Sequence, residues 1–101
     1  MAVLHVNIQH IYPDKWVELE VFNQKIGALE AKHGFPQKRR YTLVSGADEY
    51  NTLIIAYEWE SLEAFEKGYA RLFADPDFRK LNPEGNAIVK DTRVELYQTL
   101  A

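Results

Sequence analysis

The chain has 101 residues, of which 47% are hydrophobic and 27% charged, a balance typical of one globular domain. It carries 12 Lys and Arg against 15 Asp and Glu, so it lacks the basic excess of a nucleic-acid-binding protein. It has no cysteine, which excludes disulfides and thiolate metal sites, and no apolar run long enough for a membrane span. We therefore expect residues 1–101 to form a single cytoplasmic domain without nucleic-acid or membrane partners.

The first predicted element is a strand over residues 2–11 whose two faces differ in chemistry. Its side chains alternate at a period of two between an apolar and a polar set, namely Leu4, Val6 and Ile8 against His5, Asn7 and Gln9. The polar set faces solvent if the strand lies at an edge, and lines a cavity if the strand lies inside a covered sheet. The function of the chain depends largely on which of these holds.

A helix is predicted next. Its apolar stripe recurs every three or four residues and consists of Trp16, Leu19, Phe22, Ile26 and Leu29. The segment Lys32-His33-Gly34 places two cations and a glycine at its end, which is typical of a helix C-terminus.

Two strands follow, over residues 39–45 and 51–60, with a turn at residues 46–48. The inward face of the first is left open, being either Arg39, Tyr41 and Leu43 or Arg40, Thr42 and Val44. The second is apolar on both faces, with Leu53, Ile55, Tyr57 and Trp59 on one side and Ile54 and Ala56 on the other. A strand of this kind is normally buried on both faces.

Ser61 is a plausible N-cap for a second helix, whose stripe runs through Leu62, Phe65, Tyr69, Leu72 and Phe73. Asp75-Pro76 is expected to interrupt this helix, with a short turn continuing to Leu81. The composition of residues 82–86 predicts a loop, and the last strand is predicted over residues 87–99.

This order of elements predicts an α+β, ferredoxin-like βαββαβ fold. Its four-stranded antiparallel sheet would carry both helices on one face and place the first and third strands at the centre. The helices can cover only one face of the doubly apolar third strand. We therefore expect a homodimer whose sheets face each other, with the polar side of the first strand looking into the space between the sheets.

Two segments resemble a known family. They are the passage from Tyr57-Glu58-Trp59-Glu60-Ser61-Leu62 to Asp75-Pro76-Asp77-Phe78, and Arg93-Val94-Glu95-Leu96-Tyr97 near the end of the chain. Both are similar to segments of NIPSNAP-like proteins of the dimeric α+β barrel superfamily. The resemblance implies a dimer with a pocket between sheet and helices or between the two sheets. Relatives of this type include cofactor-free monooxygenases, heme-degrading enzymes, isomerases and proteins without known activity, so the fold does not select a reaction.

The polar face of the first strand supplies the main site candidates. His5 is the candidate catalytic base, because an imidazole ordinarily titrates near neutral pH, and Asn7 and Gln9 are candidate ligand-binding residues. The alternative is hydrogen bonding across the dimer seam or partial solvation.

The last strand supplies a second polar row. Arg93, Glu95 and Tyr97 share one face, while Val94 and Leu96 are expected to face the helices. Because the last strand should neighbour the first, this row could meet His5 and bind ligand. The alternative is an Arg–Glu pair that satisfies itself.

Tyr57 and Trp59 could form an aromatic wall for a ligand, or could be core residues. No metal-binding spacing, phosphate-binding loop or serine nucleophile motif is present, so neither a metal nor another cofactor is expected. The resemblance implies that a heme-binding member would carry a histidine ligand on a helix, and residues 62–81 contain no histidine, so a heme ligand is not expected.

Three functions remain open. The first is binding of a small, partly apolar ligand. The second is cofactor-independent monooxygenase or isomerase activity on an aromatic or carbonyl-rich small molecule, and the third is a structural or regulatory dimer with a filled interior. The sequence does not decide whether the protein is an enzyme.

Overall fold

The structure, a computed structural model, describes residues 2–100. The elements within this range are β1 Val3–Ile11, α1 Trp16–Lys32, β2 Arg39–Thr42, β3 Thr52–Trp59, α2 Leu62–Ala74, α3 Pro76–Ile88 and β4 Val89–Gln98. The strands therefore agree closely with their predicted ranges, except that β2 ends at Thr42 rather than Ser45.

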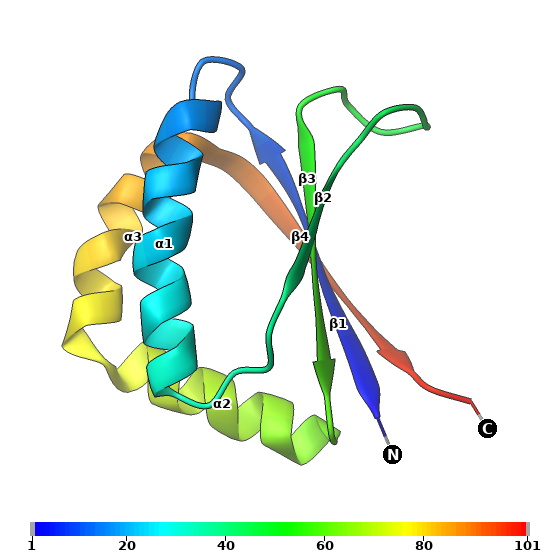
Figure 1. Cartoon of the computed structure of the whole chain (residues 1–101), viewed down its shortest axis with the longest axis vertical. Helices are drawn as coiled ribbons and strands as arrows, with labels where there is room; N and C mark the ends of the chain where they lie inside the picture. Colours follow the sequence, from blue (N-terminus) through cyan, green and yellow to red (C-terminus); the bar gives the residue numbers. More distant parts are fainter. Residues whose placement is uncertain (1, 101) are drawn as a thin grey trace.

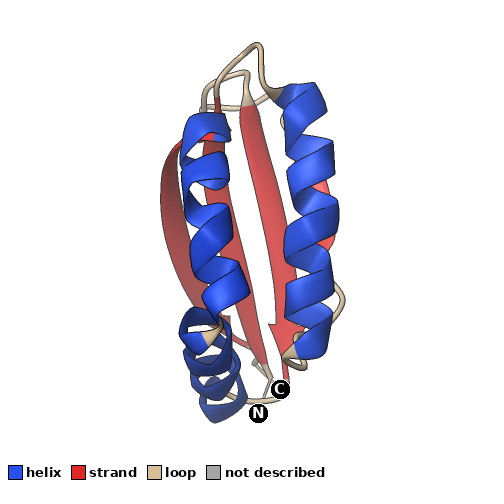
Figure 2. Cartoon of the chain, turned by 90° about the vertical axis from the view of Figure 1, so that its left-hand side faces the viewer, coloured by secondary structure: helices blue, strands red, loops and turns tan. Residues whose placement is uncertain are grey.

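The strands form one antiparallel sheet in the order β2-β3-β1-β4, so β1 and β3 are central, as predicted. All three helices lie on the same face of this sheet, which Figure 1 shows nearly edge-on. Figure 2 looks onto the helix layer, with the strands behind it. This arrangement confirms the α+β, ferredoxin-like fold and leaves the other face of the sheet without a helix.

The strand register decides which side chains face the helices. His5 lies opposite Tyr57 of β3 and Leu96 of β4, whereas Val6 lies opposite Ala56 and Glu95. The His5 row faces the helices and the Val6 row faces outward, because opposite residues share a face of the sheet. The prediction that the polar face of β1 looks into the space between two sheets is therefore wrong. Register places it on the same side as the bulky apolar residues of β3, which form the core with the helices.

The same register settles the face of β2 that the sequence left open. Arg40 pairs with Ile55 and Thr42 with Leu53, so these two residues of β2 face the helices. Arg40 reaches α1, where its Nη1 donates to both carboxylate oxygens of Glu20 at 2.9 and 3.2 Å.

Asp75 separates α2 from α3, as the Asp-Pro pair predicted. Its Oδ1 accepts a hydrogen bond from the backbone N–H of Asp77 at 2.9 Å, and Pro76 occupies the first position of α3. Its Oδ2 contacts Nε2 of His33 at 2.7 Å and Nζ of Lys32 at 3.0 Å. The contact with His33, the hydrogen bond from Asp77 and that from Lys32 hold the pKa of Asp75 well below its usual range. The end of α1 is thereby tied to the start of α3.

The predicted loop over residues 82–86 is wrong, because α3 continues through it to Ile88 with Pro83 inside the helix. Packing against α1 explains the helix. Gly85 lies so close to the Phe22 ring that a Cβ there would be 3.0 Å from the ring, and Nζ of Lys25 pairs with Glu84 at 3.1 Å. Ile88, at the end of α3, is buried in the core. The consequence is that helix α3, rather than a loop, stands over the β4 side of the sheet.

Gly68 on α2 is required by the ring of Trp59 on β3. A Cβ at Gly68 would lie 2.5 Å from Cη2 and 2.8 Å from Cζ3 of Trp59. Trp59 is 4% exposed and packs against Phe35 and Phe65 with ring centroids 4.9 and 5.9 Å away, so its rigid ring has little room to move. Glycine at this position therefore sets how closely α2 approaches β3.

We expect Gly68→Ala to lower the free energy of unfolding by about 1–3 kcal/mol, because the added methyl overpacks the core. Urea denaturation measures this change. Gly27→Ala is the matched control, since nothing lies within 4 Å of a Cβ there and alanine is the better helix former. Equal effects of the two substitutions would contradict the role assigned to Gly68.

Candidate functional site

A cavity of about 930 Å³ lies between the helix layer and the sheet. Its wall includes residues from every helix and strand described above. Such a volume falls within the range of small-molecule sites, which are mostly apolar with a few polar groups. The main apolar side chains of the wall are Leu19, Phe22, Ile26, Leu53, Ile55, Phe65, Leu72, Phe73, Phe78 and Val94.

His5 forms part of the cavity wall at one end, with its side chain packed among aromatic rings. It stacks on Tyr57 with centroids 4.9 Å apart and an interplanar angle of 12°, and it meets Phe65 and Tyr69 edge-on at 4.9 and 5.3 Å. It is only 1% exposed. A molecule in the cavity would therefore meet the residues around His5 before His5 itself.

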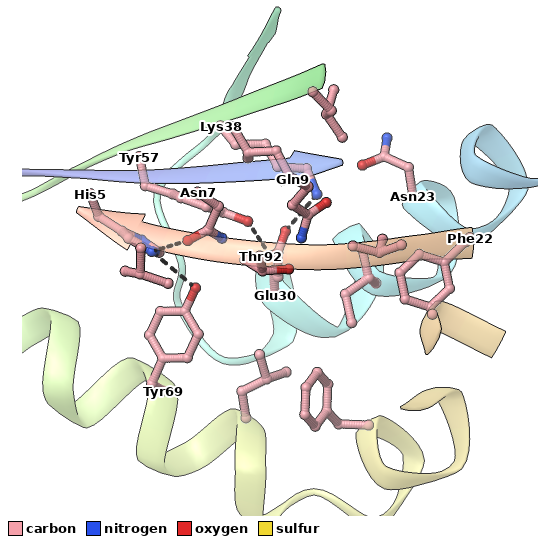
Figure 3. A pocket seen from close by; sticks show the side chains of 18 of the residues that line it. His5, Asn7, Gln9, Phe22, Asn23, Glu30, Lys38, Tyr57, Tyr69 and Thr92 are labelled. Atoms are coloured by element: carbon pink, nitrogen blue, oxygen red, sulfur yellow. Dashed lines mark hydrogen bonds and ion pairs between the residues drawn. The ribbon is translucent and has the colours of Figure 1, made fainter. Parts of the chain in front are cut away.

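Two polar groups meet His5 at Nε2. Asn7 Oδ1 lies 2.7 Å from this nitrogen and the hydroxyl of Tyr69 lies 3.5 Å from it. Figure 3 shows both side chains pointing to His5, with Phe22 and Asn23 at the other end of the view. Burial lowers the pKa of His5, and this effect outweighs the opposing influence of Asn7 and Glu30. The imidazole is therefore neutral at neutral pH.

A buried carboxylate occupies the middle of the wall. Glu30 of α1 is 7% exposed and accepts hydrogen bonds from the Tyr57 hydroxyl at 2.5 Å and from Nζ of Lys38 at 2.9 Å. Burial, followed by the neighbouring Glu30, raises the pKa of Tyr57 far above its ordinary value, so Tyr57 remains a donor. Both oxygens of Glu30 are thus engaged by protein groups.

The structure divides the predicted site residues into three groups. His5, Asn7, Gln9 and Tyr57 line the cavity. Trp59 faces the helices as well, but it belongs to the core beside Gly68 and is not part of the cavity wall among the described residues.

Arg93, Glu95 and Tyr97 form the third group, on the outward face of β4. The prediction that they could meet the polar row of β1 is wrong, because the register puts the two rows on opposite faces. Nε of Arg93 lies 3.4 Å from Oε2 of Glu95, and the Tyr97 hydroxyl donates to Oε1 of the same carboxylate at 2.5 Å. The three side chains thus satisfy one another's charges and hydrogen-bonding groups on the surface. This is the alternative of a self-paired Arg and Glu that the sequence left open.

Sequence reasoning missed most of the polar residues of the wall, among them Tyr69 and Glu30. Tyr69 occurs in the apolar stripe of α2, a position that predicts packing rather than a role in the cavity. The sequence contains a pattern that could have identified Glu30. One face of α1 recurs at spacings of three and four and consists of Leu19, Asn23, Ile26 and Glu30. Two polar residues within an apolar stripe indicate a buried polar contact.

No group of three or more His, Asp or Glu side chains within residues 2–100 is arranged to hold a metal ion. None of the helices in this part of the chain is long and apolar enough to cross a membrane.

Comparison with known proteins identifies the fold. Neither the protein-family models nor the curated protein sequences give a match. Among solved structures, a NIPSNAP family protein from Agrobacterium tumefaciens is similar with a TM-score of 0.84 at 14% identity, covering 99% of this chain and 94% of the other. An uncharacterized NIPSNAP domain protein from Burkholderia xenovorans gives 0.83 at 16%, covering 98% and 95%. The chain therefore has the fold of NIPSNAP family proteins, as the two sequence segments suggested.

A protein with a described activity shares the fold at a lower score. SnoaB, a cofactor-independent oxygenase from Streptomyces nogalater, is similar with a TM-score of 0.69 at 19% identity, covering 97% of this chain and 92% of the other. Identities at this level show a common fold and leave the activity of this chain to be argued from its own residues.

The two histidines of β1 predict opposite pH dependences of stability. Burial lowers the pKa of His5 below 6.5, so wild type loses stability relative to His5→Gln as the pH falls from 6.5 toward the lowered value. His10 contacts Asp48 at 2.7 Å and Asp91 at 2.6 Å, and its pKa is raised, chiefly by Asp48. Wild type should therefore lose stability relative to His10→Gln as the pH rises above 6.5 through the raised value.

Urea denaturation of wild type and the two variants at a series of pH values measures both differences. A stability difference for His5→Gln that does not change below pH 6.5 would contradict the burial of a neutral imidazole.

Proposed function

We propose that this protein is a NIPSNAP-like, homodimeric α+β barrel protein that binds a small, partly apolar molecule in the cavity between its sheet and helices. It acts as a single cytoplasmic domain without a cofactor. The observation that carries the proposal is the cavity itself, about 930 Å³ in a chain of 101 residues, with aromatic and aliphatic walls and polar groups at His5, Asn7 and Tyr69. An apolar molecule that displaces water from a cavity lined mostly by apolar side chains gains free energy by burying its own surface.

The outward face of the sheet supports the dimer. Its side chains include Leu4, Tyr41 and Tyr97, which are 38%, 50% and 50% exposed, and Ile54 and Ala56 lie between them on β3. No helix of the described chain covers this face (Figure 1). Apolar side chains on an uncovered sheet face, here beside the self-paired Arg93 and Glu95, are typical of an interface, and a two-fold pair of such faces is the simplest way to cover them.

The geometry favours ligand binding over catalysis by His5. A base must come within hydrogen-bonding distance of the proton that it removes, and His5 is 1% exposed behind Asn7 and Tyr69. Turnover of a phenolic or quinone-like substrate that disappears in His5→Ala would instead support the oxygenase or isomerase hypothesis.

Filling the cavity should abolish binding of an apolar probe. Ala70 and Ala28 are both exposed, but Ala70 lines the cavity from α2 whereas Ala28 lies on α1 outside the wall. We expect wild type and Ala28→Trp to bind N-phenylnaphthylamine at one saturable site per chain, and Ala70→Trp to bind it at least tenfold more weakly. Fluorescence titration measures the affinities. Equal binding by both variants would show that the probe does not occupy this cavity.

A charge at the centre of the outward face should separate the dimer. Val6 lies there between Ala56 and Glu95, and Val17 on α1, at 79% exposure, serves as the control. Sedimentation should give twice 11.7 kDa for wild type and Val17→Arg, and 11.7 kDa for Val6→Arg. A monomeric wild type at micromolar concentration would overturn the dimer.

A further inference from the structure

The hydrogen on His5 can be located from one buried atom. Nδ1 of His5 is sealed from solvent and has no hydrogen-bond partner among residues 2–100. The neutral ring carries its hydrogen on either Nδ1 or Nε2. A buried N–H without an acceptor costs more than a buried lone pair without a donor, so the hydrogen belongs on Nε2. Nε2 then donates to Asn7 Oδ1, 2.7 Å away.

This assignment leaves two hydrogen-bond donors at the end of the cavity. Asn7 Oδ1 accepts from His5, and one of the two amide N–H groups of Asn7 donates to the Tyr69 oxygen, which leaves the second N–H free. Tyr69 cannot donate to an Nε2 that already carries a hydrogen, so its hydroxyl hydrogen is free for another acceptor. Burial raises the pKa of Tyr69 to about 12, which keeps this hydroxyl protonated at neutral pH. The second Asn7 N–H and the hydroxyl hydrogen of Tyr69 have no protein acceptor among residues 2–100.

The charged groups of the deeper wall already have partners. Glu30 is bound by Lys38 and Tyr57, and Nη1 of Arg40 is bound by both oxygens of Glu20, while Nε of Arg40 is buried without a hydrogen-bond partner among residues 2–100. A charged ligand would have to break one of these pairs and lose its own hydration. The remaining charged residues of the wall, such as Glu66 and Lys90, are exposed to water. The interior thus favours a neutral molecule.

We infer that the ligand is a neutral, largely apolar molecule with a carbonyl oxygen that accepts hydrogen bonds from the Asn7 amide and the Tyr69 hydroxyl. This inference rests on the proposed ligand-binding function and names its chemical class. His5 is a positioning residue here. Its Nε2–H holds the Asn7 side chain so that an amide N–H, rather than the oxygen, is presented to the cavity.

Three naphthalenes of nearly equal shape, substituted at the same carbon, test the ligand class. Acetylnaphthalene carries a carbonyl, isopropenylnaphthalene replaces its oxygen by CH₂, and naphthoate carries a charge. We expect acetylnaphthalene to bind wild type about tenfold more tightly than either of the others, the effect of one to two net hydrogen bonds. Isothermal titration calorimetry or fluorescence quenching measures the affinities.

Substitution of the donors should remove this preference. Asn7→Leu and Tyr69→Phe should each reduce the ratio of acetylnaphthalene to isopropenylnaphthalene affinity severalfold, while Tyr12→Phe, at an exposed tyrosine outside the cavity wall, leaves it unchanged. His5→Gln, which keeps an N–H donor, should retain the preference better than His5→Leu. A purely structural role for His5 would lower binding of both compounds alike.

The outcomes separate this inference from the function on which it rests. Equal binding of acetylnaphthalene and isopropenylnaphthalene, or tightest binding of naphthoate, would overturn the carbonyl inference and leave the binding function in place. Failure of all three to bind would overturn both. The ¹⁵N chemical shifts of His5 in the free protein give an independent check, because a hydrogen on Nδ1 would overturn the assignment whatever the variants do.

Discussion

The hydrogen bond from Tyr57 to Glu30 is the contact on which the interior of this protein depends. It joins the central strand β3 to helix α1 across the layer between sheet and helices, with the two oxygens 2.5 Å apart. Lys38, at the approach to β2, donates to the other oxygen of the same carboxylate. A buried carboxylate is stable only when such partners are present, so α1 is held at a defined distance above the sheet.

That distance leaves room for the cavity. Beside the His5 end of the cavity, Gly68 lets α2 approach the Trp59 ring, while Asp75 ties the end of α1 to the start of α3. The helix layer is therefore close to the sheet at Trp59 and stands away from it between Asn7 and Phe22 (Figure 3). The volume of the cavity is therefore set by polar and steric contacts at the edges of the helix layer. The cavity walls between these contacts are mainly apolar.

The two faces of the sheet carry different side chains, because successive residues of a strand point to opposite faces. On β1 the polar row enters the cavity, and the apolar row lies on the uncovered face. On β4 the relation is reversed, with Val94 facing the helices and Arg93 and Glu95 facing outward. The cavity is thus on the helix side of the sheet, and the self-paired charges of β4 lie on the face proposed for dimerisation.

The sequence by itself determined the order of elements, the central strands, the helix break at Asp75 and the likeness to NIPSNAP proteins, because these depend on local periodicity and on caps. It also singled out His5, Asn7 and Gln9, whose polar character within a central strand is visible without coordinates. Only the tertiary structure decided which way that row faces, since both faces of β3 are apolar and either could have received the helices. It also decided that residues 82–86 are helical, because packing of α3 on α1 overrides their loop-like composition, and that Tyr69 and Glu30 reach His5 and Tyr57 from distant helices.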